Sequence, residues 1–573
     1  MKFEVTSDNK AYLEARGKIV LNACPGSGKT TAVSFKLTKL TEECEQNYGT
    51  FAGIACLSFT NVAKEEIINK YALIKGSTLG FPHIVSTIDS FVNHYVTLPF
   101  YYMLGVKSKR PSILNTVSFM DDINLGYFKT VSNKPLKFSY KPSKLKIEID
   151  GTYSWDGHKP NPKIVNNQEF EKFASKYKNW QIDNGYLNND DSTYIACFLL
   201  ENFPEIGKSL VQRFPYIIID EAQDTSEIQY KIFDLLIAAG LSNIEFVGDP
   251  YQSLYEFREA RPDLFIQRFN DVATWQQVRL TNCRRSSQGI IDVYSIFRNA
   301  TEEAIVSACL HTTDHKLKII RYDPGNLDAL IEKYKSIVGK DSDNYILVRG
   351  GTHLEKFGVK PSAEDPWKSG LAKTLINAQR QFELGNSKLC IDALRMFIAE
   401  ITIPKGDYKE RKNEEQRLKE DIDLNIKLFH FLNDMPSIDD TLDNWTQKMV
   451  ALVKSKLGID IDLELKKKGA AFYAQNIKEI LFPEVVTPFP VSTIHKVKGM
   501  TFKSVLLVLS ESSSGEQLSV RDFVQPKGLP TEKQRMLYVA LSRPESICCL
   551  AIPNTFTELE ITAQLRIEID FVR

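Results

Sequence analysis

Paired cysteines, long apolar runs and an excess of either charge are all missing from this sequence of 573 residues. None of its nine cysteines stands in a CxxC pair, so we expect reduced core residues in a cytoplasmic protein and no iron–sulfur or zinc site. No stretch of about 18 or more apolar residues occurs, and the start Met1–Val5 has no hydrophobic signal core. We therefore expect a chain that neither spans a membrane nor leaves the cell by a signal peptide.

Charge is balanced, because Lys plus Arg and Asp plus Glu both number 72. A whole-chain electrostatic field near zero neither supports nor excludes DNA as a partner. Any nucleic-acid contact would come from a local groove. Hydrophobic residues make up 43% and charged residues 25%, which excludes a mostly disordered chain. The length exceeds what one hydrophobic core serves and favours two to four domains.

The pattern of apolar residues predicts two α/β units. Short apolar runs that precede helical patterns lie at 18–24, 51–59, 215–220 and 244–248. This alternation is typical of a parallel sheet with crossover helices. Strand candidates of a second α/β unit lie at Leu317–Ile320, Tyr345–Val348, Val491–Ile494 and Val505–Leu509.

An insertion interrupts each unit. From about 100 to 190 the pattern is irregular, and Lys144–Asp150 alternates with period two, meets Gly151 and continues to Trp155, which predicts a hairpin with an Asp-Gly turn. From about 355 to 485 the pattern is mostly helical. Its segment Tyr408–Leu432 is charged and then amphipathic, which is more typical of a solvated helix face than of a binding surface.

A candidate phosphate-binding loop has the sequence Ala-Cys-Pro-Gly-Ser-Gly-Lys-Thr, from Ala23 to Thr30. A buried strand is expected to end at Ala23, and Lys29 and Thr30 would open a helix, so backbone N–H groups and one lysine charge converge on a phosphate. The first position is Ala rather than Gly, and such a pattern also arises by chance. A second element is therefore required.

That element is the run from Tyr216 to Asp224, an apolar strand that delivers Asp220 and Glu221 at its carboxyl end. Doubly wound folds place ligands at this edge. Asp220 can hold Mg²⁺ and Glu221 can polarise the attacking water, whereas the alternative is a strand end with a solvated acidic turn. Mg²⁺ and Lys29 would neutralise charge on a transferred phosphoryl group, so the sequence predicts NTP hydrolysis.

Several blocks, in order along the chain, resemble the UvrD/Rep/PcrA branch of superfamily 1 helicases. Asp220–Thr225 and Phe246–Arg258 carry the first part of the resemblance. The blocks similar to motifs Ia, Ib, IV, V and VI of that family are Leu57–Lys64, Ser86–Phe91, Leu280–Ser286, Ser492–Phe502 and Arg535–Arg543. Chance agreement of so many ordered blocks is negligible.

The resemblance implies an α/β fold with two RecA-like P-loop parallel-sheet domains, each with an inserted, mainly helical subdomain. The expected first domain is 1–99 with 190–280, interrupted by 100–189, and the second is 281–354 with 486–573, interrupted by 355–485. The implied function is an ATP-dependent 3′→5′ translocase or helicase acting on single-stranded DNA or a tailed duplex.

The resemblance also assigns residues. It implies catalytic roles for Lys29, Asp220, Glu221, Gln252, Arg285 and Arg543, the two arginines acting as fingers and Gln252 contacting the γ-phosphate. It implies ATP binding by Ala23, Cys24, Pro25, Gly26, Ser27, Gly28, Lys29, Thr30, Thr31, Arg284 and Gly499, with Mg²⁺ held by Thr30 and Asp220. The implied DNA contacts are Phe59, Thr60, Asn61, Thr87, Tyr255, Phe257 and His495.

The sequence departs from the family at the base end of the site. No Gln precedes Gln46, although the family usually reads adenine with a Gln upstream of the loop. Arg284 stands where a base-stacking Tyr is common, and Phe257 stands where Trp is usual. We therefore expect relaxed discrimination among purine nucleotides.

The insertions, of about 90 and about 130 residues, are short compared with those of full-length family members, and about thirty residues follow Arg543. This resembles the GajB-like subunit of Gabija anti-phage systems, which implies a separate, GajA-like nuclease partner. Two alternatives stay open. One is a regulatory NTPase that senses DNA ends or nucleotide and activates a partner without extensive unwinding, and the other is a housekeeping DNA repair helicase.

Overall fold

The structure of the protein is a computed structural model that describes most of the chain as two compact units, Met1–Arg349 with Ser492–Arg573 and Gly350–Val491. The described residues are 7–114, 117–121, 123, 125, 141–161, 163, 165–255, 259–309, 316–339, 343–357, 366–368, 370–383, 387–403, 414, 417–466, 470–481, 488–515 and 517–572.

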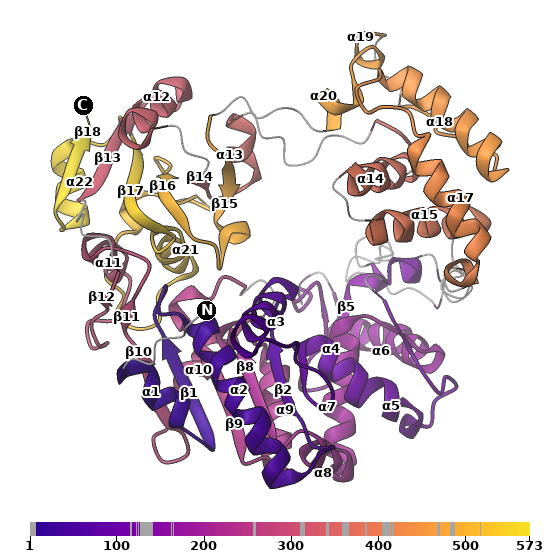
Figure 1. Cartoon of the computed structure of the whole chain (residues 1–573), viewed down its shortest axis with the longest axis horizontal. Coiled ribbons are helices and arrows are strands. Elements are labelled where there is room, and N and C mark those ends of the chain that lie inside the picture. Colours follow the sequence, from indigo (N-terminus) through magenta and orange to yellow (C-terminus); the bar gives the residue numbers. More distant parts are fainter. Residues whose placement is uncertain are drawn as a thin grey trace. The chain divides into compact units, whose positions relative to one another are not determined.

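The first unit contains two six-stranded sheets, which confirms the predicted α/β fold class (Figure 1). In the first sheet every neighbouring pair is parallel, in the order β10-β1-β9-β8-β2-β3. Its strands are β1 (Lys18–Ala23), β2 (Ile54–Ser58), β3 (Ile84–Thr87), β8 (Tyr216–Asp220), β9 (Asn243–Gly248) and β10 (Gln276–Leu280). Because all six run the same way, their carboxyl ends meet at one edge.

Both faces of this sheet are covered, as a parallel sheet requires. Ile19 and Leu21 of β1 pack in one core layer with Leu37, whereas Val20, between them, packs in the other layer with Phe233. Alternate strand residues point to opposite faces, so one apolar run serves two layers. The covering helices are α1 (Ser7–Glu14), α2 (Lys29–Tyr48), α3 (Asn61–Lys75), α4 (Ile88–Val92), α7 (Asn189–Asn202), α8 (Pro204–Arg213), α9 (Glu227–Ala238) and α10 (Pro262–Asn270).

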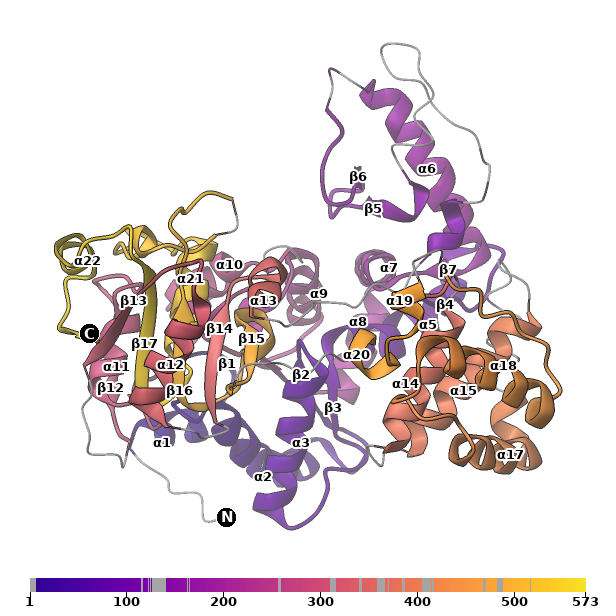
Figure 2. The ribbon, with the colours of Figure 1, turned by 90° about the horizontal axis from the view of Figure 1, so that it is seen from above.

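The insertion in the first α/β domain combines one long helix with short elements. The predicted hairpin is confirmed, since Leu145 pairs with Trp155 and Gly151 turns the chain at φ +79°. Figure 2 shows the hairpin beside α6. The elements are η1 (Asn93–Thr97), α5 (Leu98–Phe100), η2 (Tyr101–Leu104), β4 (Ser112–Ile113), η3 (Ser118–Asp121), η4 (Pro142–Lys144), β5 (Leu145–Ile147), β6 (Tyr153–Trp155), α6 (Asn167–Asn184) and β7 (Tyr186–Leu187).

The second sheet has the order β15-β14-β16-β17-β13-β18, and its pairings from β14 to β18 are parallel. Its strands are β13 (Leu317–Tyr322), β14 (Asn344–Val348), β15 (Val491–Thr493), β16 (Phe502–Val508), β17 (Pro544–Pro553) and β18 (Ile569–Val572). The elements around it are β11 (Asn282–Cys283), α11 (Gln288–Ser295), β12 (Val306–Ser307), α12 (Leu327–Val338), η9 (Val520–Asp522), α21 (Glu532–Leu541) and α22 (Glu558–Leu565).

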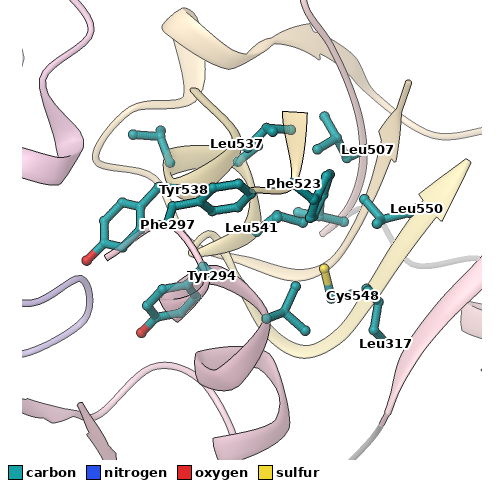
Figure 3. Close-up of a cluster of buried hydrophobic side chains, with 14 of the residues drawn as sticks. Tyr294, Phe297, Leu317, Leu507, Phe523, Leu537, Tyr538, Leu541, Cys548 and Leu550 are labelled. Atoms are coloured by element: carbon teal, nitrogen blue, oxygen red, sulfur yellow. The ribbon is translucent and has the colours of Figure 1, made fainter. Parts of the chain in front are cut away.

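Helix α21 packs into the core of the second domain (Figure 3). Tyr538 of α21 lies edge-on to Tyr294 of α11, with ring centres 5.2 Å apart, and Phe297 contacts Phe523 at 5.1 Å. This burial fixes the end of α21, and therefore Arg543, relative to the sheet.

The unit Gly350–Val491 is helical, as the sequence predicts for 355–485. Its described helices are α13 (Gly351–Lys356), α14 (Leu371–Glu383), α15 (Ser387–Thr402), α17 (Ile422–Asn433), α18 (Leu442–Leu457), α19 (Ala470–Tyr473) and α20 (Ile477–Leu481). Trp367 and Trp445 form its centre, and Trp367 donates a hydrogen bond to Thr446. Of the predicted amphipathic segment, residues 408–413, 415 and 416 lie outside the described residues.

Eight of the nine cysteines are buried and Cys309 is half-buried, in keeping with the predicted core positions. Each helix that the structure describes is too short or too polar to cross a bilayer.

Candidate active site

The loop after β1 requires glycine at two positions. Gly26 has φ +72° and Gly28, which precedes α2, has φ +85°, a backbone region that residues with a side chain rarely adopt. A Cβ at Gly26 would lie 2.6 Å from Cβ of Arg285 and 2.9 Å from Sγ of Cys283. The two glycines thus keep side chains out of the loop in front of the amino end of α2, where an anion is favoured.

Lys29 opens α2 and meets both carboxylates at the end of β8. Its Nζ lies 2.7 Å from Oε1 of Glu221 and 3.2 Å from Oδ1 of Asp220. Burial alone would lower the pKa of Lys29, but the two carboxylates raise it above its usual value. Burial alone would likewise raise the pKa of Glu221, yet Lys29 and Lys498 lower it to about 2. Glu221 is therefore an ionised hydrogen-bond acceptor at neutral pH.

Asp220 fits a divalent cation. It is fully buried. Its Oδ1 forms the 3.2 Å ion pair with Lys29, and its Oδ2 accepts no hydrogen bond within the described part of the chain. Burial raises its pKa, with Lys29 opposing that shift. No group of three or more His, Cys, Asp or Glu side chains is assembled among the described residues, so a cation here would take its remaining ligands from Thr30, phosphate and water. Mg²⁺ is commonly bound in this way.

Gln252, Arg285 and Arg543 converge from elements far apart in sequence. Gln252 ends η6 (Pro250–Gln252), donates to Asp249 over 2.8 Å and accepts a hydrogen bond from Nη2 of Arg543 over 2.9 Å. Arg285 donates to the carbonyl of Ser542 over 3.0 Å. Burial, with the nearby charge of Arg285, lowers the pKa of Arg543 to about 9. The buried guanidinium of Arg543 and the half-buried guanidinium of Arg285 are thus close enough for their charges to interact, which favours an anion beside them.

Arg284 lies against the phosphate-binding loop. Its backbone N–H donates to the carbonyl of Gly26 over 2.8 Å, and its Nη1 donates to the carbonyl of Ser27 over 2.5 Å. The predicted ATP contact Gly499 is exposed, in a turn with φ +85°. At the amino end of the chain, Asn9 of α1 is buried.

Most of the predicted DNA contacts gather at the carboxyl ends of β2 and β3. The rings of Phe59 and Tyr255 lie 5.2 Å apart, tilted by 34°. Thr60 caps α3 and Thr87 caps α4 by accepting backbone hydrogen bonds. Asn61 is the exposed first residue of α3, and His495 is a half-buried residue of η8 (Ile494–Val497). Phe257 lies outside the described residues.

Comparison with known proteins shows a similarity to DNA helicases. Residues 5–273 match the sequence profile of the UvrD/REP helicase N-terminal domain. A protein described as a probable DNA helicase from Mycoplasma pneumoniae is 26% identical over 383 residues, which are 62% of this chain and 68% of the relative. ATP-dependent DNA helicase Rep from Buchnera aphidicola is 24% identical over 357 residues, 59% of this chain and 49% of Rep. The amino-terminal part of the chain is thus similar to the UvrD/REP helicases.

Both of these relatives are described as DNA helicases. A protein described as a probable DNA helicase II homolog from Mycoplasma capricolum is also similar, at 25% identity over 301 residues, 50% of this chain and 40% of the relative. The chain thus spans about two thirds of the first relative and half or less of the other two.

The structure adds a lysine that sequence reasoning did not single out. Lys498 pairs with Asp224, lies 3.9 Å from Oε2 of Glu221 and stands over the ring of Tyr255 at 5.0 Å. Burial raises the pKa of Asp224 to about 6, with Lys498 opposing the shift. Lys498 and Asp224 both lie in blocks that resemble the helicase family. The charged residues of those blocks were therefore the sequence signal from which this ion pair could have been sought.

Two residues of α21 complete the contact between the two α/β domains. Arg535, almost fully buried, donates to the carbonyl of Ser253 over 2.8 Å. The hydroxyl of Tyr538 donates to Oδ2 of Asp249 over 3.2 Å. One helix of the second domain therefore contacts the segment that carries Gln252 at several points.

Proposed function

We propose that the chain hydrolyses ATP and uses the cycle to move 3′→5′ along single-stranded DNA, unwinding a tailed duplex. The hydrogen bond between Gln252 and Arg543 carries this proposal, because it joins the two α/β domains beside the Lys29 and Glu221 pair. A nucleotide phosphate bound at this point would change the contact between the domains.

The residues divide the chemistry as follows. Backbone N–H groups of Gly26, Gly28 and Lys29 would bind the phosphates, while Thr30 and Asp220 would hold Mg²⁺, whose role is to neutralise charge on the phosphoryl group. Glu221 would orient the attacking water as a hydrogen-bond acceptor. Arg285 and Arg543 would stabilise charge that develops in the transition state, and only when the two domains are in contact.

Single-stranded DNA would lie across the carboxyl ends of β2 and β3. Phe59 and Tyr255 offer aromatic faces on which bases stack without regard to sequence. Lys498 links Tyr255 to Glu221, which supports coupling between the DNA contact and the water-orienting carboxylate.

The decisive experiment is strand displacement on a duplex with a 3′ tail, by the purified chain and by Lys29→Ala. Unwinding by the wild-type chain alone, absent from Lys29→Ala, supports the helicase. ATP hydrolysis without unwinding would favour the alternative, an NTPase that senses DNA ends or nucleotide and activates a partner. Hydrolysis of ATP by Lys29→Ala at the wild-type rate would contradict the whole assignment. A 5′-tailed duplex is the control for polarity.

The proposal extends to the choice of nucleotide base and to a protein partner. Without an upstream Gln and with Arg284 at the stacking position, GTP should be hydrolysed at a rate comparable with ATP, and strict ATP preference would contradict this.

The resemblance to Gabija systems suggests a separate nuclease. The measurement is DNA-stimulated ATPase activity with and without a nuclease encoded beside the chain, and no effect would favour a housekeeping repair helicase.

A further inference from the structure

A row of three polar side chains crosses the carboxyl edge of the first sheet. Ser58, the last residue of β2, is in register with Asp220 of β8 on one side and with Thr87 of β3 on the other. Residues in register on neighbouring parallel strands point to the same face. Asp220 is in turn in register with Val247, which belongs to the core layer under α2. The three polar side chains therefore share the face that α2 covers.

Ser58 is the member of this row whose hydroxyl has no partner. It is fully buried, and no described residue forms a hydrogen bond with its Oγ. Thr87 instead accepts the N–H of Ser90 and donates to the hydroxyl of the same residue over 2.9 Å. Oδ1 of Asp220 lies 3.2 Å from Nζ of Lys29, but its Oδ2 accepts no hydrogen bond within the described chain. A buried hydroxyl and a buried carboxylate oxygen without hydrogen bonds on adjacent strands indicate a bound ion or water between them.

Packing gives no reason for a hydroxyl at this place. The other residues of β2, from Ile54 to Leu57, are apolar or cysteine and wholly buried, so a small apolar side chain would satisfy the core equally well. A hydroxyl differs in that it can donate one hydrogen bond and accept two.

We propose that Ser58 is a positioning residue for the divalent cation, whose hydroxyl holds a cation-bound water against Asp220. The inference rests on the proposed function and names a further residue of the same site. Mg²⁺ keeps several waters when few protein ligands reach it, and those waters need acceptors. Groups that orient a ligand or water of a metal in this way commonly change its affinity by about 10–100-fold. Because Phe59 follows Ser58 directly, the cation and the DNA contact meet at the end of one strand.

The test measures Mn²⁺ binding to the full chain with ADP and without DNA, by the electron paramagnetic resonance signal of free Mn²⁺. Ser58→Ala should weaken Mn²⁺ binding about tenfold, and Ser58→Cys, which keeps the volume but bonds weakly to water, should do the same. Ser58→Thr retains the hydroxyl and should restore binding. Ser504→Ala, which removes a buried hydroxyl from the second sheet, is the matched control and should bind Mn²⁺ like the wild type.

A second readout is the Mg²⁺ concentration for half-maximal ATP hydrolysis, which should rise about tenfold in Ser58→Ala. If Ser58→Ala does not fold, Ser58→Cys against Ser58→Thr decides the question. Asp220→Asn separates the two proposals. Wild-type Mn²⁺ affinity in Ser58→Ala or Ser58→Cys, together with its loss in Asp220→Asn, would overturn the role of Ser58 alone. Unchanged affinity in Asp220→Asn would remove the cation from this edge and contradict the proposed function too.

Discussion

Arg543 donates a hydrogen bond from Nη2 to Oε1 of Gln252 across 2.9 Å, although 291 positions separate the two residues in the chain. Gln252 follows β9 of the first sheet, and Arg543 precedes β17 of the second. The contact places a charged group of one domain on the residue proposed to face the γ-phosphate in the other. The site therefore depends on both domains at once.

A double-mutant cycle on this pair is the first prediction. Arg543→Ala should lower kcat by about a thousandfold, the range that loss of an arginine finger costs, while nucleotide affinity stays close to the wild type. Gln252→Ala should lower kcat less, and the double variant should be no slower than Arg543→Ala, because both changes remove one contact. Steady-state hydrolysis checks this, with the exposed Arg417→Ala as control. Effects that multiply would show that the two residues act independently.

Gly26 gives a prediction about shape. Gly26→Ala would place Cβ within 2.6 Å of Cβ of Arg285, so it should weaken nucleotide binding and reduce the free energy of unfolding by about 1–3 kcal/mol beyond the backbone cost. Gly76→Ala is the matched control, since Gly76 has a similar φ of +78° but no atom within 4 Å of the added Cβ. It should cost only about 1 kcal/mol and bind nucleotide normally. Urea unfolding and nucleotide titration measure both. Equal losses in the two variants would refute the steric argument.

Asp224 gives a prediction about pH. Burial raises its pKa from 3.8 to about 6, so the folded chain binds this proton more tightly than the unfolded chain. The stabilisation is fully present below pH 3.8 and is lost as the pH rises through about 6. Asp224→Asn is neutral throughout and should gain about 3 kcal/mol of stability relative to the wild type between pH 4 and 7.

Melting temperatures across that pH range, without nucleotide or metal, measure the difference. In Lys498→Met, Asp224 should stay protonated to a higher pH, because Lys498 opposes the rise in the pKa of Asp224. A constant difference between Asp224→Asn and the wild type would rule out a titrating Asp224.

The aromatic pair gives a prediction about DNA. Phe59→Ala and Tyr255→Ala should each weaken binding of single-stranded oligonucleotides by about 5- to 150-fold, equivalent to about 1–3 kcal/mol per stacked base. Phe51→Ala, at a ring that is 76% exposed, should bind like the wild type. Fluorescence anisotropy at fixed salt checks all three. Normal affinity in both ring variants would move the DNA path elsewhere.

The sequence predicted the parts of the molecule that local pattern specifies. Strands β1 and β8 are apolar runs. The phosphate-binding loop directly follows β1 in the sequence, and the two carboxylates stand at the end of β8. Strand β10 was not predicted, because three of its five residues, Gln276, Gln277 and Arg279, are polar and no apolar run marks it before it pairs with β1. The role of Lys498 was missed for a similar reason, since its partner Asp224 lies 274 positions away and only tertiary structure brings them together.

The strand order of the first sheet has a consequence for synthesis of the chain. β1 pairs with β9 and β10, and thus with residues 243–280, so the phosphate-binding loop has no complete support until about 260 residues beyond β1 have been made. At a usual rate of translation this takes roughly 15–55 seconds. During that interval β1 presents unpaired edges and apolar faces at the ribosome, and the insertion, including its hairpin, emerges before the strands that β1 awaits. Newly made chains should therefore need protection from aggregation longest in their first segment.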